Sequence, residues 1–503
     1  MNIWKKEKIR VRIAPSPTGA LHIGTARSAL FNYLFAKKNK GSFILRIEDT
    51  DLERSDLKWT QDIIDGLKWL GIEWDEGPDI GGAFGPYKQT QRIESYTKYL
   101  EKLLGEDKAY FCFCSSKDLE EKRQEQMTRG AAPKYDGTCA HLSKETVKKN
   151  ISEGRPSVIR FRMHEKKIKF KDLIRGEIEF DTGLMGDIVI AKDTKTPLYN
   201  FAVVVDDYEM QISHVIRGED HIANTPKQMM LQDALSFKPP AYAHIPLILA
   251  PDRSKMSKRY GSVSISDYKN MGYLPEAVIN FMALLGWNPG TEKEIFSLSQ
   301  LEKEFSLDKV QKAGAVFNIQ RLDFINGYYI REKSDKKVAE LCLPYLMSAG
   351  LIDGNRKIKG GEEVSEKKLE KIIQAYKARL KKLSEIVELA DFFFKEKLEY
   401  NMDKLKWGTM DYAQTIESLN YSEKILSEID NWEQKILEEK LMGAATKFNL
   451  EKGYPEKNRG YLLWPLRVAL SAKEASASPF EIADILGKEK TLQRINDAIE
   501  ALA

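Results

Sequence analysis

The first fifty residues show two hydrophobic periodicities in succession. Apolar and basic residues alternate over residues 9–13 (IRVRI), which predicts a strand with one buried face. A turn rich in Pro and Gly (APSPTGALHIG) follows, and a second strand is expected over residues 42–47. A strand, a loop, a helix and a strand in this order are typical of the parallel-sheet units that bind nucleotides. The helix between the strands is predicted by the i, i+3, i+4 spacing of Ala26, Ala29, Leu30, Tyr33 and Leu34.

Later segments predict further domains. Residues 94–200 mix helical and strand patterns and carry three of the four cysteines, so they are expected to form an inserted segment. The stretches FAVVVDDYEMQISHVIRGED and HIPLILAPD carry strand signals that would complete the sheet. From residue 326 onward strand signals disappear and the chain is expected to be all-α. A 3.6-residue period there runs through Leu369, Ile372, Ile373, Tyr376, Leu380, Leu383, Val387 and Ala390.

Composition narrows the class of protein without fixing its function. A chain of 503 residues corresponds to three or four domains at about 150 residues each. It is 42% hydrophobic and 31% charged, and its net charge of +4 neither proves nor opposes a nucleic-acid partner. No apolar run approaches the roughly 18 residues of a membrane span, and no apolar leader opens the chain. A cytoplasmic protein without membrane association is therefore expected.

Two short motifs suggest phosphate chemistry. In LHIGT, His22 and Gly24 stand at the predicted start of a helix, where unpaired N–H groups and the helix dipole attract phosphate. In SKMSKRYGS, Lys255 and Lys258 would stabilise the negative charge that builds on a leaving pyrophosphate. Each motif alone has a plain alternative, a turn histidine for the first and a solvated basic loop for the second. Together, and in this order, they are specific.

With RIAPSPTGALHIGTARSALFNYLFA, RIEDTD, PLYNFAVVVDD, VIRGEDH and KMSKR, the chain resembles the bacterial-type glutamyl-tRNA synthetase branch of the class I aminoacyl-tRNA synthetases. The resemblance extends through GAVFNIQRLDFINGYYIR and LLWPLRVALSA and covers nearly the whole chain. It implies an enzyme that activates L-glutamate with ATP and Mg²⁺. The glutamyl group would then pass to the 3′-terminal ribose of tRNA-Glu.

The resemblance also implies an α/β fold with a Rossmann-type catalytic domain, an α+β insertion and an all-α anticodon-binding region. Five parts are expected, and an insertion separates the two halves of the catalytic domain. They are 1–93 (catalytic, first half), 94–200 (acceptor-end insertion), 201–262 (catalytic, second half), 263–325 (stem contact) and 326–503 (anticodon).

Substrate contacts follow from the same resemblance. An arginine reads a carboxylate through paired hydrogen bonds that the amide of glutamine cannot reproduce. Arg12 is expected to read the side-chain carboxylate and Glu48 to receive the ammonium group, although an ordinary ion pair at a strand end is the alternative. The other implied glutamate contacts are Ser16, Tyr199 and Arg217. The implied ATP contacts are Ser16, His22, Gly24, Asp220, Lys255, Ser257 and Lys258, of which His22, Lys255 and Lys258 are also expected to be catalytic.

The cysteine cluster suggests a structural metal. Cys112, Cys114, Cys139 and His141 supply four ligands from two short segments, the Cys₃His set of a closed tetrahedral zinc site. The alternative is three reduced structural cysteines, since a disulfide is disfavoured in the cytosol. A subset of the resembling synthetases carries a similar Cys-x-Cys…Cys-x-His motif, which implies Zn²⁺ here.

The helical C-terminal region favours the bacterial type, because the other branches read the anticodon with β-barrels. The run KARLKK (377–382) is expected to gather cations on a helix, and Arg379 matches the position that reads the last anticodon base. An enzyme that also charges tRNA-Gln is the nearest alternative, and a non-catalytic tRNA-binding paralogue is a further one. The resemblance implies a monomer.

Overall fold

The structure is a computed structural model that describes residues 8–256, 264–358 and 361–503. It divides into two compact units. Unit 1 comprises Met1–Lys269 and Pro275–Leu322, and unit 2 comprises Asn270–Leu274 and Asp323–Ala503. Among the described residues, none of the helices is long and apolar enough to span a membrane.

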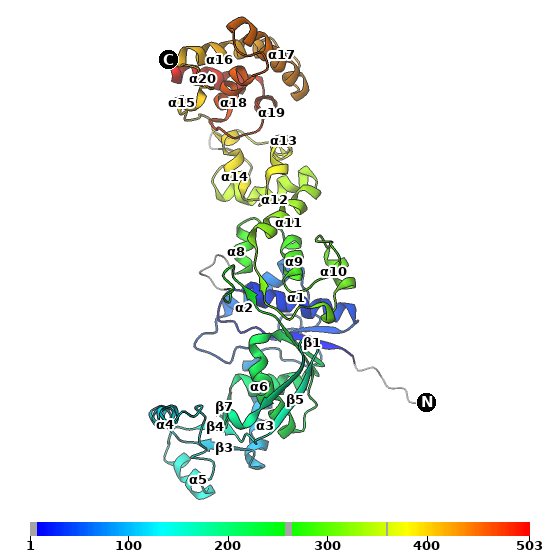
Figure 1. Cartoon of the computed structure of the whole chain (residues 1–503), viewed down its shortest axis with the longest axis vertical. Coiled ribbons are helices and arrows are strands. Elements are labelled where there is room, and N and C mark those ends of the chain that lie inside the picture. The colour runs from blue at the N-terminus through cyan, green and yellow to red at the C-terminus, as the bar shows by residue number, and fades with distance from the viewer. Residues whose placement is uncertain (1–7, 257–263, 359–360) are drawn as a thin grey trace, which may run out of the picture. The chain divides into compact units, whose positions relative to one another are not determined.

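The N-terminal part of unit 1 confirms the predicted strand, helix and strand. Strand β1 (Arg10–Ile13) pairs in parallel with β2 (Ser42–Leu45), with Arg10 opposite Ser42. Helix α1 (Ile23–Lys38, labelled in Figure 1) connects them. It buries its apolar positions, including Leu30 and Leu34. Both strands are buried along their whole length, so the basic residues of β1 are also inside.

A second parallel pair lies beside the first. Strands β9 (His214–Gly218) and β10 (Ala241–Ile245) pair in register, and the N–H of Ser213 donates to the carbonyl of Arg10, which places β9 against β1. Helix α7 (Thr225–Leu235) connects β9 to β10. The first and second halves of the fold thus share one layer of strands, as expected.

One strand expectation is wrong. The stretch FAVVVDDYE lies in helix α6 (Tyr199–Glu209), and only the following residues form strand β9. Seven consecutive residues of this helix, 201–207, are buried, so its apolar run carries no one-sided period that separates helix from strand. Their surroundings in the core decide the conformation.

The inserted segment is α+β, as expected. Its core is an antiparallel sheet in the order β3 (Ala109–Cys112), β4 (Val158–Phe161), β7 (Ile188–Asp193) and β8 (Thr196–Pro197). A separate hairpin joins β5 (Lys167–Asp172) to β6 (Gly176–Asp181), and its end contacts β10 where the N–H of Leu173 donates to the carbonyl of Tyr242. The helices of this segment are α3 (Ile93–Gly105), α4 (Ser116–Thr128) and α5 (Lys144–Ser152).

Short elements complete unit 1. Strand β11 (Ile248–Leu249) pairs in parallel with β12 (Ala315–Val316). The remaining helices are α2 (Leu57–Trp69), α8 (Ile265–Asn270), α9 (Pro275–Leu284) and α10 (Leu298–Glu304).

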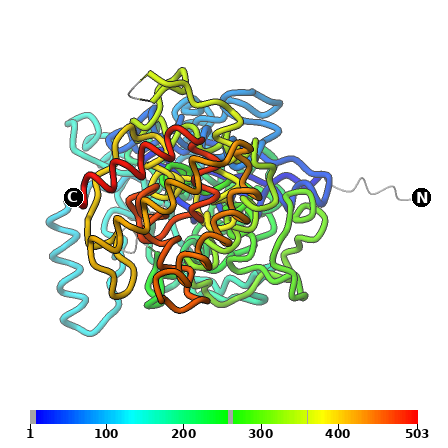
Figure 2. The backbone as a smooth tube through the Cα atoms, turned by 90° about the horizontal axis from the view of Figure 1, so that it is seen from above, coloured from blue at the N-terminus to red at the C-terminus, as the bar shows by residue number. Residues whose placement is uncertain are grey.

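Unit 2 is helical, as expected; within its described residues the only β pairing is an isolated bridge between Lys357 and Glu363. Helices α16 (Tyr412–Ser427) and α20 (Lys488–Leu502) run side by side (Figure 1, Figure 2). The side chain of Asn496 donates to the Glu423 carboxylate across them at 3.2 Å. The helices from α11 on are α11 (Ile319–Glu332), α12 (Asp335–Ser348), α13 (Glu366–Tyr376), α14 (Glu385–Ala390), α15 (Met402–Leu405), α16 (Tyr412–Ser427), α17 (Gln434–Lys452), α18 (Gly460–Ser471), α19 (Pro479–Leu486) and α20 (Lys488–Leu502).

The expected continuous period over residues 369–390 is interrupted. Helix α13 ends at Tyr376, Lys377–Arg379 form a 3₁₀ turn, and Leu380 is extended before α14 begins. The chain leaves the helix because other groups take its backbone bonds: the N–H of Lys381 donates to the Glu385 carboxylate, and that of Leu383 to the Gly272 carbonyl. The cations of KARLKK therefore do not share one helix face.

Candidate active site

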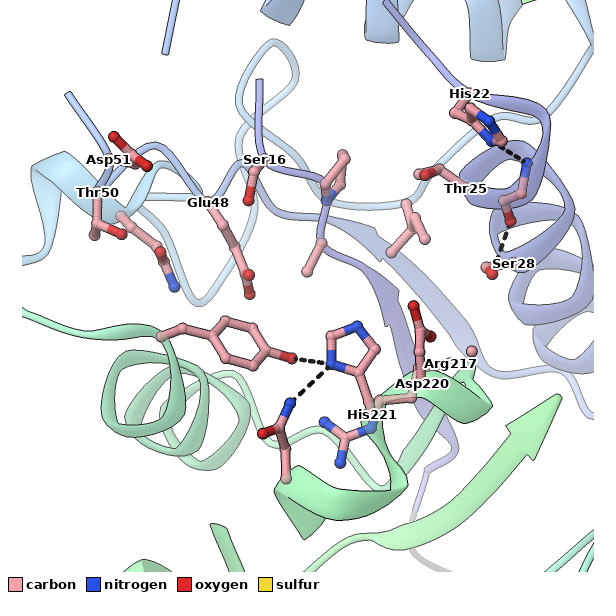
Figure 3. Close-up of a pocket in the computed structure, with 18 of the residues that line it drawn as sticks. Ser16, His22, Thr25, Ser28, Glu48, Thr50, Asp51, Arg217, Asp220 and His221 are labelled. Atoms are coloured by element: carbon pink, nitrogen blue, oxygen red, sulfur yellow. Dashed lines mark hydrogen bonds between the residues drawn. The ribbon is translucent and has the colours of Figure 1, made fainter. Parts of the chain in front are cut away.

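A cavity of about 980 Å³ opens at the carboxyl ends of β1 and β9. Ligands of open parallel sheets bind at this edge. Figure 3 shows residues from the segments that follow β1 and β2, from the start of α1, and from β9 and the segment after it converging on this cavity. Nine of the residues singled out from the sequence line the cavity: Arg12, Ser16, His22, Gly24, Glu48, Tyr199, Arg217, Asp220 and Lys255. Ser257 and Lys258 lie outside the described residues.

The start of α1 faces this cavity. His22 is the N-cap residue, and its Nδ1 accepts a hydrogen bond from the Gly24 N–H at 3.0 Å (Figure 3). Because Nδ1 is the acceptor, the neutral imidazole carries its proton on Nε2 and is a donor there. A Cβ on Gly24 would lie 3.3 Å from His22 Nδ1, so a larger residue would disturb this cap. The helix dipole and the histidine together suit an anionic group.

Lys255 lies at the same cavity and forms an ion pair. Its Nζ is 3.0 Å from Asp220 Oδ2, and its side chain is mostly exposed. Burial opposes ionisation of Asp220, but the hydrogen bond from Lys255 and the nearby His221 outweigh it and hold the pKa of the carboxyl below its ordinary value. An exposed pair of this kind is weak. A polyphosphate can therefore take Lys255 away from Asp220 at little cost.

Arg12 is buried at 4% exposure and is bound by a carboxylate of the chain itself. Its Nε and Nη2 donate to the two oxygens of Asp207 at 3.1 and 3.2 Å. Arg46, which is fully buried, donates to the same Asp207 at 2.7 Å and to Glu48 at 3.1 Å. Burial works against ionisation of Asp207, but Arg12 and Arg46 hold the pKa of Asp207 below its ordinary value. The charge of Arg12 is thus matched within the protein.

Glu48 lines the cavity, and its pKa is shifted in the opposite direction from that of Asp207. Burial raises the pKa of Glu48 above its ordinary value, although Arg46 and Arg12 act to lower it. A cationic group that entered beside Glu48 would favour its ionised form. This side chain is suited to receive an ammonium group.

Arg217 is also buried, at 6% exposure, but each of its hydrogen-bond partners in the described structure is neutral. Nε donates to His244 Nε2 at 3.2 Å, Nη1 to Gln228 Oε1 at 2.8 Å and Nη2 to Thr225 Oγ1 at 2.9 Å. Burial lowers the pKa of Arg217. A buried guanidinium without a carboxylate partner is stabilised by an anion that enters the cavity.

Tyr199 completes this part of the site. Its hydroxyl lies 2.9 Å from His221 Nδ1, and burial raises the pKa of the phenol. Burial and the positive charge of Arg217 lower the pKa of His221 to about 4, so this imidazole is neutral at pH 7. His221 also lines the cavity, next to Asp220, where the family resemblance implies a contact with the adenylate. No role was predicted from the sequence for Asp207 or Arg46. The signal for these two residues was a charged side chain within a mainly apolar segment, FILRIE for Arg46 and VVVDD for Asp207.

The cysteine segment forms a separate cluster in unit 1. The thiols of Cys112, Cys114 and Cys139 lie within 4.8 Å of one another. The hydroxyl of Tyr135 is 3.3 Å from Cys112 Sγ and 3.6 Å from Cys114 Sγ. His141 is exposed and does not join this group. The structure therefore brings together three of the four expected ligands.

Arg379 lies in unit 2, in the 3₁₀ turn after α13. Its Nη1 donates to the carbonyl of Ser476 at 2.9 Å, and the guanidinium stands 5.7 Å from the ring centre of Tyr376. The residue is exposed.

Comparisons with known families cover most of the chain. Residues 8–324 match the family model of tRNA synthetases class I (E and Q), catalytic domain, and residues 337–499 match an anticodon binding domain. The chain therefore has the domains of a class I aminoacyl-tRNA synthetase.

Individual proteins similar to this chain indicate which branch of the synthetases it belongs to. A glutamate–tRNA ligase of Carboxydothermus hydrogenoformans is 45% identical over 488 residues, which cover 97% of this chain and 99% of that protein. One of Desulforamulus reducens is 41% identical over 98% of this chain and all of that protein. The crystal structure of a glutamate tRNA ligase from Elizabethkingia meningosepticum, in complex with its amino acid, matches with a TM-score of 0.85 and 35% identity, covering 99% of this chain and 100% of that one. The chain belongs to the glutamate–tRNA ligase family.

Proposed function

We propose that this protein activates L-glutamate with ATP and transfers the glutamyl group to the 3′-terminal ribose of tRNA-Glu. The observation that supports the proposal is the set of side chains that line one cavity. Three groups line the same space: a helix N-terminus suited to phosphate, a carboxylate with a raised pKa, and a buried guanidinium whose hydrogen-bond partners among the described residues are all neutral. These groups complement a nucleoside triphosphate, a carboxylate and an ammonium group.

Within this proposal, each residue has a defined task. His22, Gly24 and Lys255, with Ser257 and Lys258, bind the phosphates of ATP, and His22, Lys255 and Lys258 stabilise the charge that moves onto pyrophosphate. Ser16 and Asp220 also contact ATP. Arg12, Ser16, Tyr199 and Arg217 bind the carboxylates of glutamate, and Glu48 binds its ammonium group. Mg²⁺ enters with ATP and neutralises part of its charge.

We further propose that the insertion holds a structural Zn²⁺. Three thiols within 4.8 Å of one another fit a tetrahedral site, and the coordinated form of each is the thiolate. The fourth ligand is His141, as the motif implies, or the Tyr135 oxygen, which lies beside two of the sulfurs. Bound zinc would fix the shape of residues 94–200 that meet the acceptor end of tRNA.

The remaining proposals concern tRNA and assembly. Residues 326–503 bind the anticodon and Arg379 contacts its last base, with residues 263–325 against the stem. The enzyme acts as a monomer in the cytoplasm, where tRNA is charged. A variant of this proposal, in which tRNA-Gln is charged as well, rests on the same catalytic site.

The test is aminoacylation by the full chain with labelled glutamate and separately purified tRNA-Glu and tRNA-Gln. Labelled glutamine serves as the amino-acid control. We expect glutamate to be attached to tRNA-Glu and glutamine to neither tRNA. Attachment of glutamate to both tRNAs would establish the wider specificity, and attachment to neither would refute the proposal and favour a non-catalytic tRNA-binding protein.

A further inference from the structure

We infer that Asp172 and His244 are positioning residues for Arg217: they fix its guanidinium for the carboxylate of glutamate while leaving its positive charge uncompensated. The inference deepens the proposed function and rests on it, because that proposal assigns Arg217 to glutamate. Neither residue lines the cavity, so both act through Arg217.

The three side chains form a buried chain that crosses from the inserted hairpin to the catalytic sheet. Asp172 ends β5, and its Oδ2 lies 2.7 Å from His244 Nδ1. His244 on β10 is the direct register partner of Arg217 on β9, and its Nε2 accepts from Arg217 Nε at 3.2 Å. The side chains of Asp172 and His244 are both fully buried.

The hydrogen bonds determine where the imidazole proton lies. Arg217 Nε always carries a hydrogen, so His244 Nε2 must be the acceptor. The single proton of the neutral ring is then on Nδ1, where it donates to Asp172. Burial, with the positive charge of Arg217, lowers the pKa of His244 despite the carboxylate, which is consistent with a neutral ring. A protonated ring would set two N–H groups against each other at Nε2.

Asp172 is itself fixed by the backbone. Its Oδ1 accepts from the N–H groups of Ile174 and Arg175, each at 2.9 Å, and its Oδ2 also accepts from the His244 N–H at 3.1 Å. With four N–H groups pointing at it, this carboxylate has one orientation and no capacity to donate. It therefore enforces the Nδ1–H tautomer of His244.

The choice of an imidazole next to Arg217 has an electrostatic consequence. A carboxylate at the position of His244 would orient Arg217 equally well but would cancel its charge, as Asp207 does for Arg12. The lone pair of a neutral imidazole orients the guanidinium without cancelling its charge. Three of the five N–H groups of Arg217 are engaged by described residues, and the other two belong to the terminal nitrogens Nη1 and Nη2. That pair suits a carboxylate.

The experiment compares H244A, H244Q and D172N in the full enzyme, measuring KM for glutamate, KM for ATP and kcat in aminoacylation of tRNA-Glu. H244A removes one bond to a charged donor, so we expect KM for glutamate to rise about 10- to 100-fold. KM for ATP should change less than about threefold, because the ATP residues that the structure describes are not among the hydrogen-bond partners of Asp172 and His244. In H244Q, the side-chain oxygen can accept from Arg217, and most of the glutamate affinity should return.

D172N tests the tautomer. The Asn oxygen is needed by the N–H groups of Ile174 and Arg175, so its NH₂ group faces His244 Nδ1 and drives the ring proton to Nε2, opposite Arg217 Nε–H. We expect KM for glutamate to rise as in H244A, with KM for ATP unchanged. H214Q is the matched control, since His214 lies on β9 but bonds Ser213 rather than Arg217, and it should behave as wild type.

The outcomes separate this inference from the proposed function. If wild type does not charge tRNA-Glu, or if R217Q binds glutamate as wild type does, the proposed function or its assignment of Arg217 fails. If R217Q raises KM for glutamate but H244A and D172N do not, only the inference is overturned. Equal losses for glutamate and ATP, or no recovery in H244Q, would also overturn it, because they indicate general damage to the fold.

Discussion

Replacing Arg46 by Met should destabilise unit 1 strongly, whereas replacing Arg217 by Met should not. The two arginines are similarly buried, yet their surroundings differ in charge. Arg46 donates to Asp207 at 2.7 Å and to Glu48 at 3.1 Å, and lies 3.6 Å from Asp206. The described partners of Arg217 are all neutral.

The magnitudes follow from what each substitution leaves behind. In R46M, Glu48 loses its only described salt bridge and Asp207 keeps only Arg12, so buried negative charge is left uncompensated. Breaking a buried pair from one side costs about 3–5 kcal/mol. At about 2 °C per kcal/mol for a unit of this size, the transition of unit 1 should fall by about 6–10 °C.

R217M leaves no anion behind. Its cost is one unpaired acceptor, Gln228 Oε1, because Thr225 Oγ1 and His244 Nε2 lie 3.2 Å apart and can bond each other. Removing a poorly solvated charge offsets that cost, and we expect the melting temperature to stay within about 3 °C of wild type. Affinity for glutamate should nevertheless fall sharply, since the charge that attracts its carboxylate is gone.

Differential scanning calorimetry of the full chain at pH 7.5 measures both variants. A second series of measurements at lower pH tests whether charge causes the loss. The carboxylates that lose Arg46 in R46M take up protons as pH falls, so the difference in melting temperature between R46M and wild type should become smaller. The reasoning would be refuted if R46M melted with wild type, or if R217M lost as much stability as R46M. Either result would mean that burial rather than charge pairing determines these energies.

Three further predictions concern other residues of the proposed sites. Because the pKa of Glu48 is raised, KM for glutamate should increase as pH falls and Glu48 gains a proton, whereas in E48Q it should be high and independent of pH. Metal analysis should find about one zinc ion per chain in wild type and none in C139S. Comparing H141A with Tyr135→Phe identifies the fourth ligand, because only the substitution of that ligand should remove the metal. R379A should reduce the preference for tRNA-Glu over tRNA-Gln without changing KM for glutamate, and a loss of glutamate affinity instead would contradict its assignment to the anticodon.

Much of the fold could be predicted because local pattern and burial agree. Strands β1 and β2 agree with the predicted ranges to within two residues, and helix α1 contains all five of the apolar positions that predicted it. The all-α character of unit 2 follows from the loss of strand signals. Helix α6 could not be assigned in this way, since a segment buried on all sides has no polar face to reveal its period. The break after Tyr376 depends on a distant carbonyl, that of Gly272, which no local pattern contains.

In the candidate site, too, some features could be predicted from the sequence and others could not. His22 and Gly24 could be recognised from the sequence because their role at the start of a helix depends on neighbouring residues, as the hydrogen bond between them shows. Their meeting with Asp220 and Lys255 was predictable from the resemblance alone. The pairing of Arg12 with Asp207 could not be predicted, since the two residues belong to elements far apart in sequence and nothing in either segment specifies the other. Charges inside apolar segments mark such residues but do not identify their partners.

The pairing of Arg12 with Asp207 affects how the proposed enzyme would choose glutamate over glutamine. Arg12 was expected to read the side-chain carboxylate, but Asp207 already engages two of its donors and matches its charge. Arg217, held by neutral groups, is the guanidinium whose burial is compensated only when an anion binds. Glutamine offers a neutral amide in place of the second carboxylate, so it would leave one buried charge unmatched. Discrimination would then come from the cost of that unmatched charge, and the neutral His244 would be the feature that preserves it.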